Sequence, residues 1–285
     1  MLAPQSQGRQ AVEPKNQGAQ QKPVEIGVSW ESPETIQEYK YTLVIPAYNE
    51  EKRISPFLKS ILEEAPASTE IIVVCDGSDR TADIVRTFGN RMKLITFSQR
   101  QGKGGAIIEG FKLAKGEVVG FVDADGAIPA YEVFRLASTV DQNNPCVIGS
   151  RWVRGSVVEH PEPVMRIIVG RVFHYMTFMI LGLRYKDTQC GVKFFHKNLC
   201  KVLVKRVQVK SWMIDVALLY HTKLLNLPIA EVGIRWSHQD HSRFPVLRAA
   251  SMMFATLVGL KFVHSAKARL RKNVAQRVSR EIKRW

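Results

Sequence analysis

Two carboxylates, Asp123 and Asp125, follow an apolar run at residues 118–122 and stand directly before a glycine. Side chains two residues apart on a strand point to the same side, so both carboxylates face one point if the strand continues through Ala124. Two like charges held that close require a cation between them. Mg²⁺ is commonly held by one or two carboxylates together with the phosphates of a substrate. The pair therefore predicts a divalent-cation site, whereas an isolated Asp-x-Asp is more often a solvated strand end.

The chain around this pair alternates strand-like and helix-like segments. Strand patterns occupy residues 41–46, 71–75, 92–97, 117–122 and 146–148, and helical patterns occupy residues 51–63, 81–88, 104–114 and 130–140. Such alternation indicates an α/β fold with a mostly parallel sheet that is covered by helices on both faces. Ligands bind beyond the carboxyl ends of the strands in such sheets. Polar residues that follow the strands are therefore expected to converge.

Four strand ends carry polar or glycine-rich segments of this kind. They are Pro46-Ala47-Tyr48-Asn49-Glu50, Asp76-Gly77-Ser78-Asp79, Gln101-Gly102-Lys103-Gly104-Gly105 and Asp123-Ala124-Asp125. Lys103 supplies a cation among glycines that permit close backbone approach to a ligand, a combination that suits phosphate groups. The P-loop spacing is absent, and no Gly-x-Gly-x-x-Gly follows the first strand.

These segments, together with Gly149-Ser150-Arg151, resemble in order and spacing the inverting glycosyltransferases of GT-A fold, in the family that includes dolichyl-phosphate mannose and glucose synthases. The resemblance covers residues 41–245. It implies that Asp125 and Asp123 bind Mg²⁺ or Mn²⁺ on the diphosphate of a nucleotide sugar. It also implies a set of donor-binding residues, namely Pro46, Ala47, Tyr48, Glu50, Asp76, Lys103, Asp123 and Gln189. With Arg151, the two aspartates form the predicted catalytic set.

Two departures from the family pattern bear on the sugar. Cys75 stands where an aspartate is more usual, and Ala127 stands where mannose synthases have a glutamine that can bind the metal. Residues 123–127 and 187–191 look closer to the dolichyl-phosphate glucose synthases. UDP-glucose is therefore the favoured donor, with GDP-mannose second.

The second half of the chain is expected to hold the acceptor. Arginine recognises phosphate through its planar fork of donors, and by resemblance Arg151, Arg166 and Arg243 address a dolichyl or polyprenyl phosphate. A predicted helix at residues 164–183 gathers Arg166, Gly170, His174 and Thr177 on one arc and apolar residues on the other. Such a helix belongs either to the core or to a membrane surface.

The acceptor determines which residues the chemistry needs. A polyprenyl phosphate is already ionised, so its transfer needs alignment and charge stabilisation but no general base. A hydroxyl acceptor would require a catalytic carboxylate, which Asp187 or Asp215 would have to provide.

Composition bounds the partners and the setting. The 285 residues include 45% hydrophobic residues and carry a formal net charge of +15, which attracts anionic partners. The four cysteines show no paired spacing that would indicate zinc or a disulfide framework. No signal-peptide pattern and no apolar stretch of about 18 uncharged residues is present. We expect a peripheral protein on the cytoplasmic face of a membrane.

The predicted organisation has four parts. Residues 1–38 read as a disordered tail, residues 39–155 as the nucleotide-sugar-binding half and residues 156–245 as the acceptor-binding half. Residues 246–285 are expected to form C-terminal amphipathic helices on the membrane, because basic residues surround an apolar stripe ending at Trp285.

Three alternatives stay open at this stage. A glycosyltransferase with a hydroxyl acceptor would keep every donor residue. A nucleotidyltransferase generally places a glycine-rich loop where this chain has Pro46-Ala47-Tyr48. A non-enzymatic basic scaffold that binds nucleic acid explains the charge but not the convergent strand ends, and we expect no nucleic-acid partner.

Overall fold

The computed structural model describes residues 38–239, 246–265 and 280. The expected tail, Arg243 and most of the basic C-terminal segment lie outside these residues. The helical segment of residues 249–260 and its neighbours are described, as are the strand ends that carry the predicted site.

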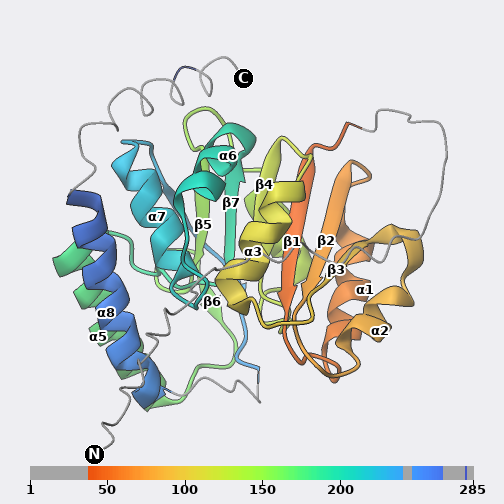
Figure 1. Cartoon of the computed structure of the whole chain (residues 1–285), viewed down its shortest axis with the longest axis horizontal. Helices are drawn as coiled ribbons and strands as arrows, with labels where there is room; N and C mark the ends of the chain where they lie inside the picture. The colour runs from red at the N-terminus through yellow and green to blue at the C-terminus, as the bar shows by residue number, and fades with distance from the viewer. Residues whose placement is uncertain (1–37, 240–245, 266–279, 281–285) are drawn as a thin grey trace, which may run out of the picture.

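A seven-stranded sheet in the order β3-β2-β1-β4-β7-β5-β8 runs through the molecule (Figure 1). Its strands are β1 (Tyr41–Ala47), β2 (Thr69–Cys75), β3 (Lys93–Thr96), β4 (Val118–Val122), β5 (Cys146–Ser150), β7 (Val192–His196) and β8 (Ala230–Gly233). All neighbours pair in parallel except β7, which is antiparallel to both β4 and β5. A small parallel ladder joins β6 (Val157–Val158) to β9 (Arg235–Trp236). The expected mostly parallel α/β sheet is confirmed.

Helices cover both faces of this sheet. One layer contains α1 (Ile54–Glu64), α2 (Thr81–Arg86) and α4 (Ala130–Ala137), and the other contains α3 (Gly102–Leu113), α6 (Lys197–Arg206) and α7 (Ile214–Leu224). A short 3-10 turn lies at Gly89–Arg91. Consecutive β1 residues alternate between the layers: Leu43 and Ile45 pack with the α1 side, and Val44 packs with the α3 side. The sequence pattern did not indicate α6, β8 or the small ladder.

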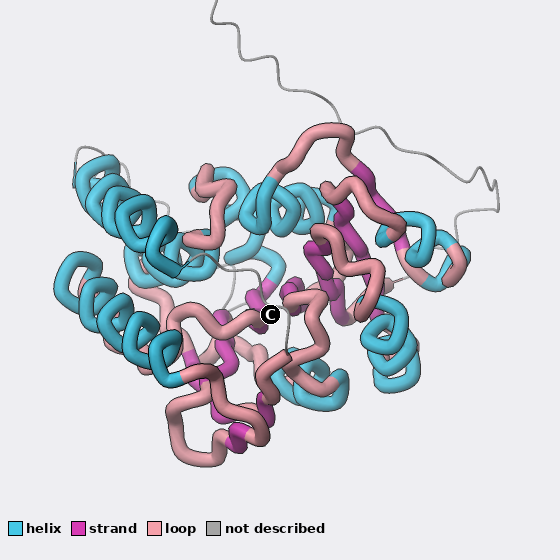
Figure 2. The backbone as a smooth tube through the Cα atoms, turned by 90° about the horizontal axis from the view of Figure 1, so that it is seen from below, coloured by secondary structure: helices cyan, strands magenta, loops and turns pink. Residues whose placement is uncertain are grey.

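Two long apolar helices, α5 (Val164–Leu181) and α8 (Val246–Ser265), lie side by side at one end of the sheet (Figures 1 and 2). On α8, Met253, Leu257 and Leu260 are buried, so this part of the C-terminal segment packs on the protein. Among the residues that the structure describes, α5 is the one helix long and apolar enough to cross a membrane, with a mean hydropathy of 1.5. The expectation that the sequence has no apolar stretch of about 18 uncharged residues still holds, because α5 contains Arg166 and Arg171.

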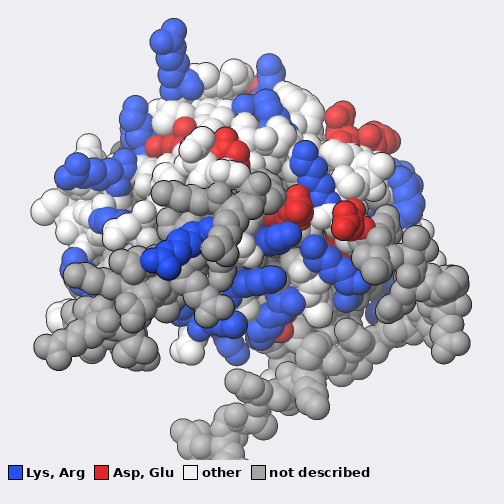
Figure 3. All heavy atoms as spheres, turned by 90° about the horizontal axis from the view of Figure 1, so that it is seen from above, with Lys and Arg blue, Asp and Glu red and all other residues white. Residues whose placement is uncertain are grey.

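Positive charge is not confined to one edge of the molecule. Figure 3 shows the edge opposite to the carboxyl ends of the parallel strands, where Lys and Arg side chains are scattered with Asp and Glu side chains between them. The large net charge therefore does not mark the site by itself.

The antiparallel strand β7 is packed against β4 through a glycine. Gly120 is paired with Phe194, and a Cβ atom at Gly120 would overlap the Phe194 ring. Since overpacking a buried contact costs about 1–3 kcal/mol, we expect Gly120→Ala to lower the melting temperature clearly. Gly259→Ala on α8, where an added Cβ meets nothing within 4 Å, is the matched control and should be neutral or slightly stabilising. Equal melting temperatures for the two variants would contradict this packing, and differential scanning calorimetry measures both.

Candidate active site

The polar residues predicted to converge lie at the carboxyl edge of the sheet, which Figure 2 views from below. The loops after β1 and β2 are tied together there. The backbone N–H of Ser78 donates to Asn49 Oδ1 over 2.9 Å, and that of Glu50 donates to Thr81 Oγ1 over 2.8 Å. These contacts hold the first two strand ends as one platform.

Asp76 fixes the start of α3 rather than standing open to solvent. Its Oδ2 accepts the backbone N–H groups of Gln101 at 2.8 Å and Gly102 at 2.7 Å, where the helix dipole favours a negative charge. The glycines of this segment serve packing: a Cβ at Gly102 or Gly104 would overlap the backbone of residues 209–211. The close backbone approach expected from these glycines is thus made by the chain itself.

Asp123 and Asp125 come from a turn, because β4 ends at Val122. The strand does not continue through Ala124 as the alternation argument required. Asp125 Oδ1 accepts the N–H of Ala127 over 3.0 Å, and Gly126 takes a φ of 72°, which favours glycine. Asp123 donates its backbone N–H to Gly191 O over 2.9 Å. The turn still leaves the two carboxylates near enough for the charge of Asp125 to raise the pKa of Asp123.

Lys103 is buried between two carboxylates. Its Nζ lies 2.8 Å from Asp123 Oδ1 and 3.0 Å from Asp215 Oδ2. Burial works to lower the pKa of Lys103, but the two carboxylates outweigh it and raise the pKa, so the lysine stays charged. Burial raises the pKa of Asp123 to about 6 against the opposing effect of Lys103. Lys103, which the sequence predicted to bind phosphate groups, thus also neutralises Asp123.

Arg53 lies beside the predicted carboxylates but was not predicted from the sequence. It directly precedes α1 and donates two hydrogen bonds to the carboxylate of Glu50. Nε donates to Oε2, and Nη2 donates to Oε1 over 2.9 Å. Its pKa is raised, first by the hydrogen bond to Glu50, with Asp125 and Asp123 adding to the shift. Its Nη1 is buried and has no hydrogen-bond partner. The only available signal was its position three residues after Glu50.

The other predicted residues at the end of β1 differ in their exposure to solvent. Pro46 is half-buried and Ala47 is buried at the end of β1, while Tyr48 is exposed under the guanidinium of Arg100, 4.0 Å from its ring centroid. An exposed aromatic ring at a strand end offers a flat surface for stacking.

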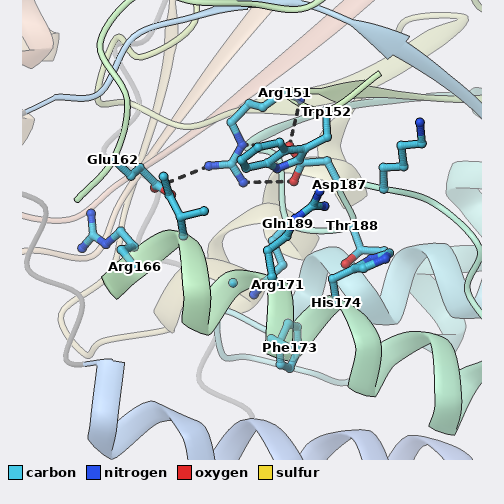
Figure 4. Close-up of a pocket in the computed structure, with 13 residues that line it drawn as sticks. Arg151, Trp152, Glu162, Arg166, Arg171, Phe173, His174, Asp187, Thr188 and Gln189 are labelled. Atoms are coloured by element: carbon cyan, nitrogen blue, oxygen red, sulfur yellow. Dashed lines mark hydrogen bonds and ion pairs between the residues drawn. The ribbon is translucent and has the colours of Figure 1, made fainter. Parts of the chain in front are cut away.

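Arg151 anchors a pocket, shown in Figure 4, that Asp187, Thr188 and Gln189 help to line. Its guanidinium holds Asp187 through Nε at 2.8 Å and Nη2 at 3.0 Å, and Nη1 lies 3.4 Å from Glu162. Burial works to raise the pKa of Asp187, but Arg151 outweighs it, so the pKa is lowered and the carboxylate stays ionised. Arg151 is thus engaged with protein carboxylates.

The same pocket contains more cations than anions. Two residues predicted from the sequence, Gln189 and Arg166, line it, and Arg166 is in the first turn of α5 (Figure 4). Arg171, not predicted, lies over the Trp152 ring at 4.4 Å. Arg151, Arg166, Arg171 and Lys186 stand against Glu162 and Asp187, four cations to two carboxylates. Arg243 lies outside the described residues.

The residues present fit a divalent cation held partly by its ligand. Among the described residues, no three His, Cys, Asp or Glu side chains gather as a closed metal site. Asp125 and Asp123 supply the oxygen ligands that Mg²⁺ or Mn²⁺ prefers, and the unpartnered Arg53 Nη1 beside them suits an anion. An open site of this kind leaves coordination positions for a diphosphate.

The Arg151–Asp187 pair should govern acid stability. Because the folded-state pKa of Asp187 is lowered, its stabilising contribution is present above the unfolded value of about 3.9 and is lost as pH falls through the lower folded value. Asp187→Asn leaves a buried guanidinium with only its longer contact to Glu162, 3.4 Å from Nη1, so we expect it to cost about 3 kcal/mol at neutral pH and to flatten the loss of stability below about pH 4.

Urea unfolding between pH 3 and pH 7 measures this. Asp83→Asn, which removes an exposed pair with Arg86, is the control and should change stability by less than about 1 kcal/mol. A wild-type profile unchanged by Asp187→Asn would refute the assignment.

Comparison with known proteins agrees with this geometry. The profile of glycosyl transferase family 2 matches residues 42–204. The chain is 31% identical to dolichyl-phosphate beta-glucosyltransferase of Drosophila melanogaster, covering 76% of this chain and 72% of the relative, and 30% identical to that of Saccharomyces cerevisiae, covering 80% and 76%. The structure resembles glucosyl-3-phosphoglycerate synthase of Mycobacterium tuberculosis with a TM-score of 0.60 at 21% identity, covering 78% of this chain and 80% of that chain, which supports the GT-A fold. The chain is a member of glycosyl transferase family 2.

Proposed function

We propose that this protein is a metal-assisted inverting glucosyltransferase that moves glucose from UDP-glucose to a dolichyl-type phosphate at a membrane surface. The similarity to enzymes named dolichyl-phosphate beta-glucosyltransferase supports the sugar and the acceptor. GDP-mannose is the second donor to test.

A phosphate acceptor is supported mainly by one observation. The two carboxylates that could act as a base toward a hydroxyl acceptor, Asp215 and Asp187, are both paired with cations. Asp215 directs Oδ1 to Lys193 at 2.6 Å and Oδ2 to Lys103 at 3.0 Å. Asp187 uses both oxygens on Arg151. Both oxygens of each carboxylate are engaged by cationic donors, so neither carboxylate is free to face an acceptor hydroxyl as a general base. An acceptor that is already ionised needs no such base.

The cation-rich pocket suits that acceptor. Arg166 and Arg171 line it together with Arg151, and Arg151 holds the pocket wall in place through Asp187 and Glu162. Residues 187–191 separate this pocket from Asp123. An acceptor phosphate held there would stand next to a donor held at the carboxylates.

The chemistry is an in-line displacement at the anomeric carbon. A phosphate oxygen of the acceptor forms the new bond to that carbon while the bond from the carbon to the diphosphate oxygen breaks. A divalent cation, when bound, neutralises the departing diphosphate. Asp125 and Asp123 would hold it, Arg53 and Lys103 would stabilise the phosphates, and the first-loop platform with Asp76 would orient the nucleotide.

Helix α5 supports an attachment to the membrane. Its polar arc faces the pocket, whereas Met165, Ile168, Val172 and Met179 are 50–78% exposed. A helix with an exposed apolar face of this length suits a membrane surface. Lys223 contacts the carbonyls of Leu181 and Gly182 at the far end of α5. Its pKa is lowered by burial and then by the charges of Lys261 and Arg184. We place the protein on the cytoplasmic face, as a peripheral enzyme.

Arg166 tests the acceptor assignment. We expect Arg166→Gln to raise KM for dolichyl phosphate about tenfold or more with little change in the KM for UDP-glucose, because a charge-assisted phosphate contact is lost. Arg154→Gln, an exposed arginine in the same segment, should behave as wild type. Transfer of radiolabelled glucose to the lipid is the measurement. Transfer to soluble hydroxyl acceptors, but never to a polyprenyl phosphate, would overturn the proposal.

The outward face of α5 tests the membrane assignment. We expect Ile168→Ser with Met179→Ser to reduce cosedimentation with anionic vesicles several-fold, since buried apolar area drives interfacial binding. Val157→Ser, an exposed valine that belongs to β6 and not to α5, is the control. Vesicle binding that is unaffected by the α5 double variant would contradict this placement.

A further inference from the structure

A lysine is buried in the middle of the sheet, outside the residues that the reaction uses directly. Lys193 lies on the antiparallel strand β7, and its side chain has no solvent exposure. Its Nζ donates to Cys190 O at 2.6 Å and to Asp215 Oδ1 at 2.6 Å. Burying a charged pair costs free energy unless the two groups are well oriented and fully hydrogen-bonded. Removing one partner from a buried pair costs more, because it leaves the other charge unpaired.

This pair continues into the active site as a row of alternating charges. Asp215 Oδ2 lies 3.0 Å from Lys103 Nζ, and Lys103 Nζ lies 2.8 Å from Asp123 Oδ1. The order from core to site is therefore Lys193, Asp215, Lys103 and Asp123. Exposure rises along the row, from none at Lys193 to 29% for the Asp123 side chain.

The fold assembles this row from four elements. Lys193 is on β7, Asp215 is in the first turn of α7, Lys103 is in the first turn of α3 and Asp123 follows β4. The glycines at the start of α3 let residues 209–211 pack against it, and the N–H of Gly104 donates to Lys210 O at 3.0 Å. That contact brings α7, and with it Asp215, to Lys103.

We infer that Lys193 and Asp215 are positioning residues that set how tightly Lys103 holds Asp123, and thereby how readily Asp123 is released to a divalent cation. The inference rests on the proposed function, in which Asp123 and Asp125 bind the cation. Lys103 divides its attraction between two carboxylates, so Asp215 weakens its hold on Asp123. Lys193 neutralises part of Asp215 and reduces that competition. A cation must compete with Lys103 for Asp123.

The row predicts effects of opposite sign from two neighbouring substitutions. In Asp215→Asn, Lys103 pairs with Asp123 alone, so Mn²⁺ should bind more weakly, with a Kd raised about tenfold. In Lys193→Met, the unneutralised Asp215 draws Lys103 away from Asp123, so Mn²⁺ should bind more tightly, with a Kd lowered about threefold or more. Electron paramagnetic resonance of free Mn²⁺, without nucleotide, measures both values on the full chain.

The double variant Lys193→Met with Asp215→Asn covers the case in which a single variant fails to fold. It removes the buried pair as a unit, which is less damaging than breaking it, and its Kd should match that of Asp215→Asn. Lys197→Met, which removes an ion pair with Glu117, is the matched lysine control and should leave Kd unchanged. Circular dichroism melting confirms that each variant is folded.

The outcomes separate the inference from the proposed function. If wild type binds Mn²⁺ and Asp125→Asn abolishes binding, but the folded Asp215 and Lys193 variants, single or double, keep the wild-type Kd, the positioning role is wrong and the metal site stands. Shifts of the same sign in both single variants also overturn it, because they indicate a general structural effect. If wild type binds Mn²⁺ only when UDP is present, the same comparison of Kd values is made with UDP. If it binds Mn²⁺ neither alone nor with UDP, both the metal site and this inference fall.

Discussion

The charge of buried carboxylates at one edge of the sheet is the constraint on which the site depends. Asp76, Asp187 and Asp215 are buried and Asp123 is half-buried, and each needs donors or cations to remain there. Backbone N–H groups at a helix start satisfy Asp76, and lysines or an arginine satisfy the others. The cost of leaving such a group unpaired explains why these loops are held so firmly.

These pairings join two parts of the chain that are far apart in sequence. The β7 strand enters antiparallel between β4 and β5, so residues 187–191, which precede it, reach the carboxyl end of β4. Asp187 then faces Arg151 on one side of this segment, and Gly191 contacts Asp123 on the other. The donor carboxylates and the cation-rich pocket become neighbours because one strand runs against the direction of the rest.

Helix α5 turns polar residues toward the pocket and apolar residues toward the outside. Arg166, Gly170 and His174 line the pocket, and Phe173, Thr177 and Leu181 are buried, while Met165, Val172 and Met179 face outward. In a helix that packs on a core and faces water, the apolar residues would be buried and the polar ones exposed. Both arcs were predicted from the sequence, but not which of them faces inward. The outward position of the apolar arc is the feature that supports our proposal of a membrane surface.

The sequence by itself determined the strand ends and the order of their polar segments, because the periods of 2 and 3.6 residues and the parallel-sheet rule are local or general. Asp123, Asp125, Asp76, Glu50 and Lys103 were found in this way. Their partners were decided only by the tertiary structure. Lys103 meets Asp215 across 112 residues, and Arg151 meets Asp187 across 36. Neither pairing has a local signal, since each depends on how α7 and the segment before β7 pack against the first half. The same holds for Arg53 and Lys193, whose roles follow from burial beside charges that distant elements deliver.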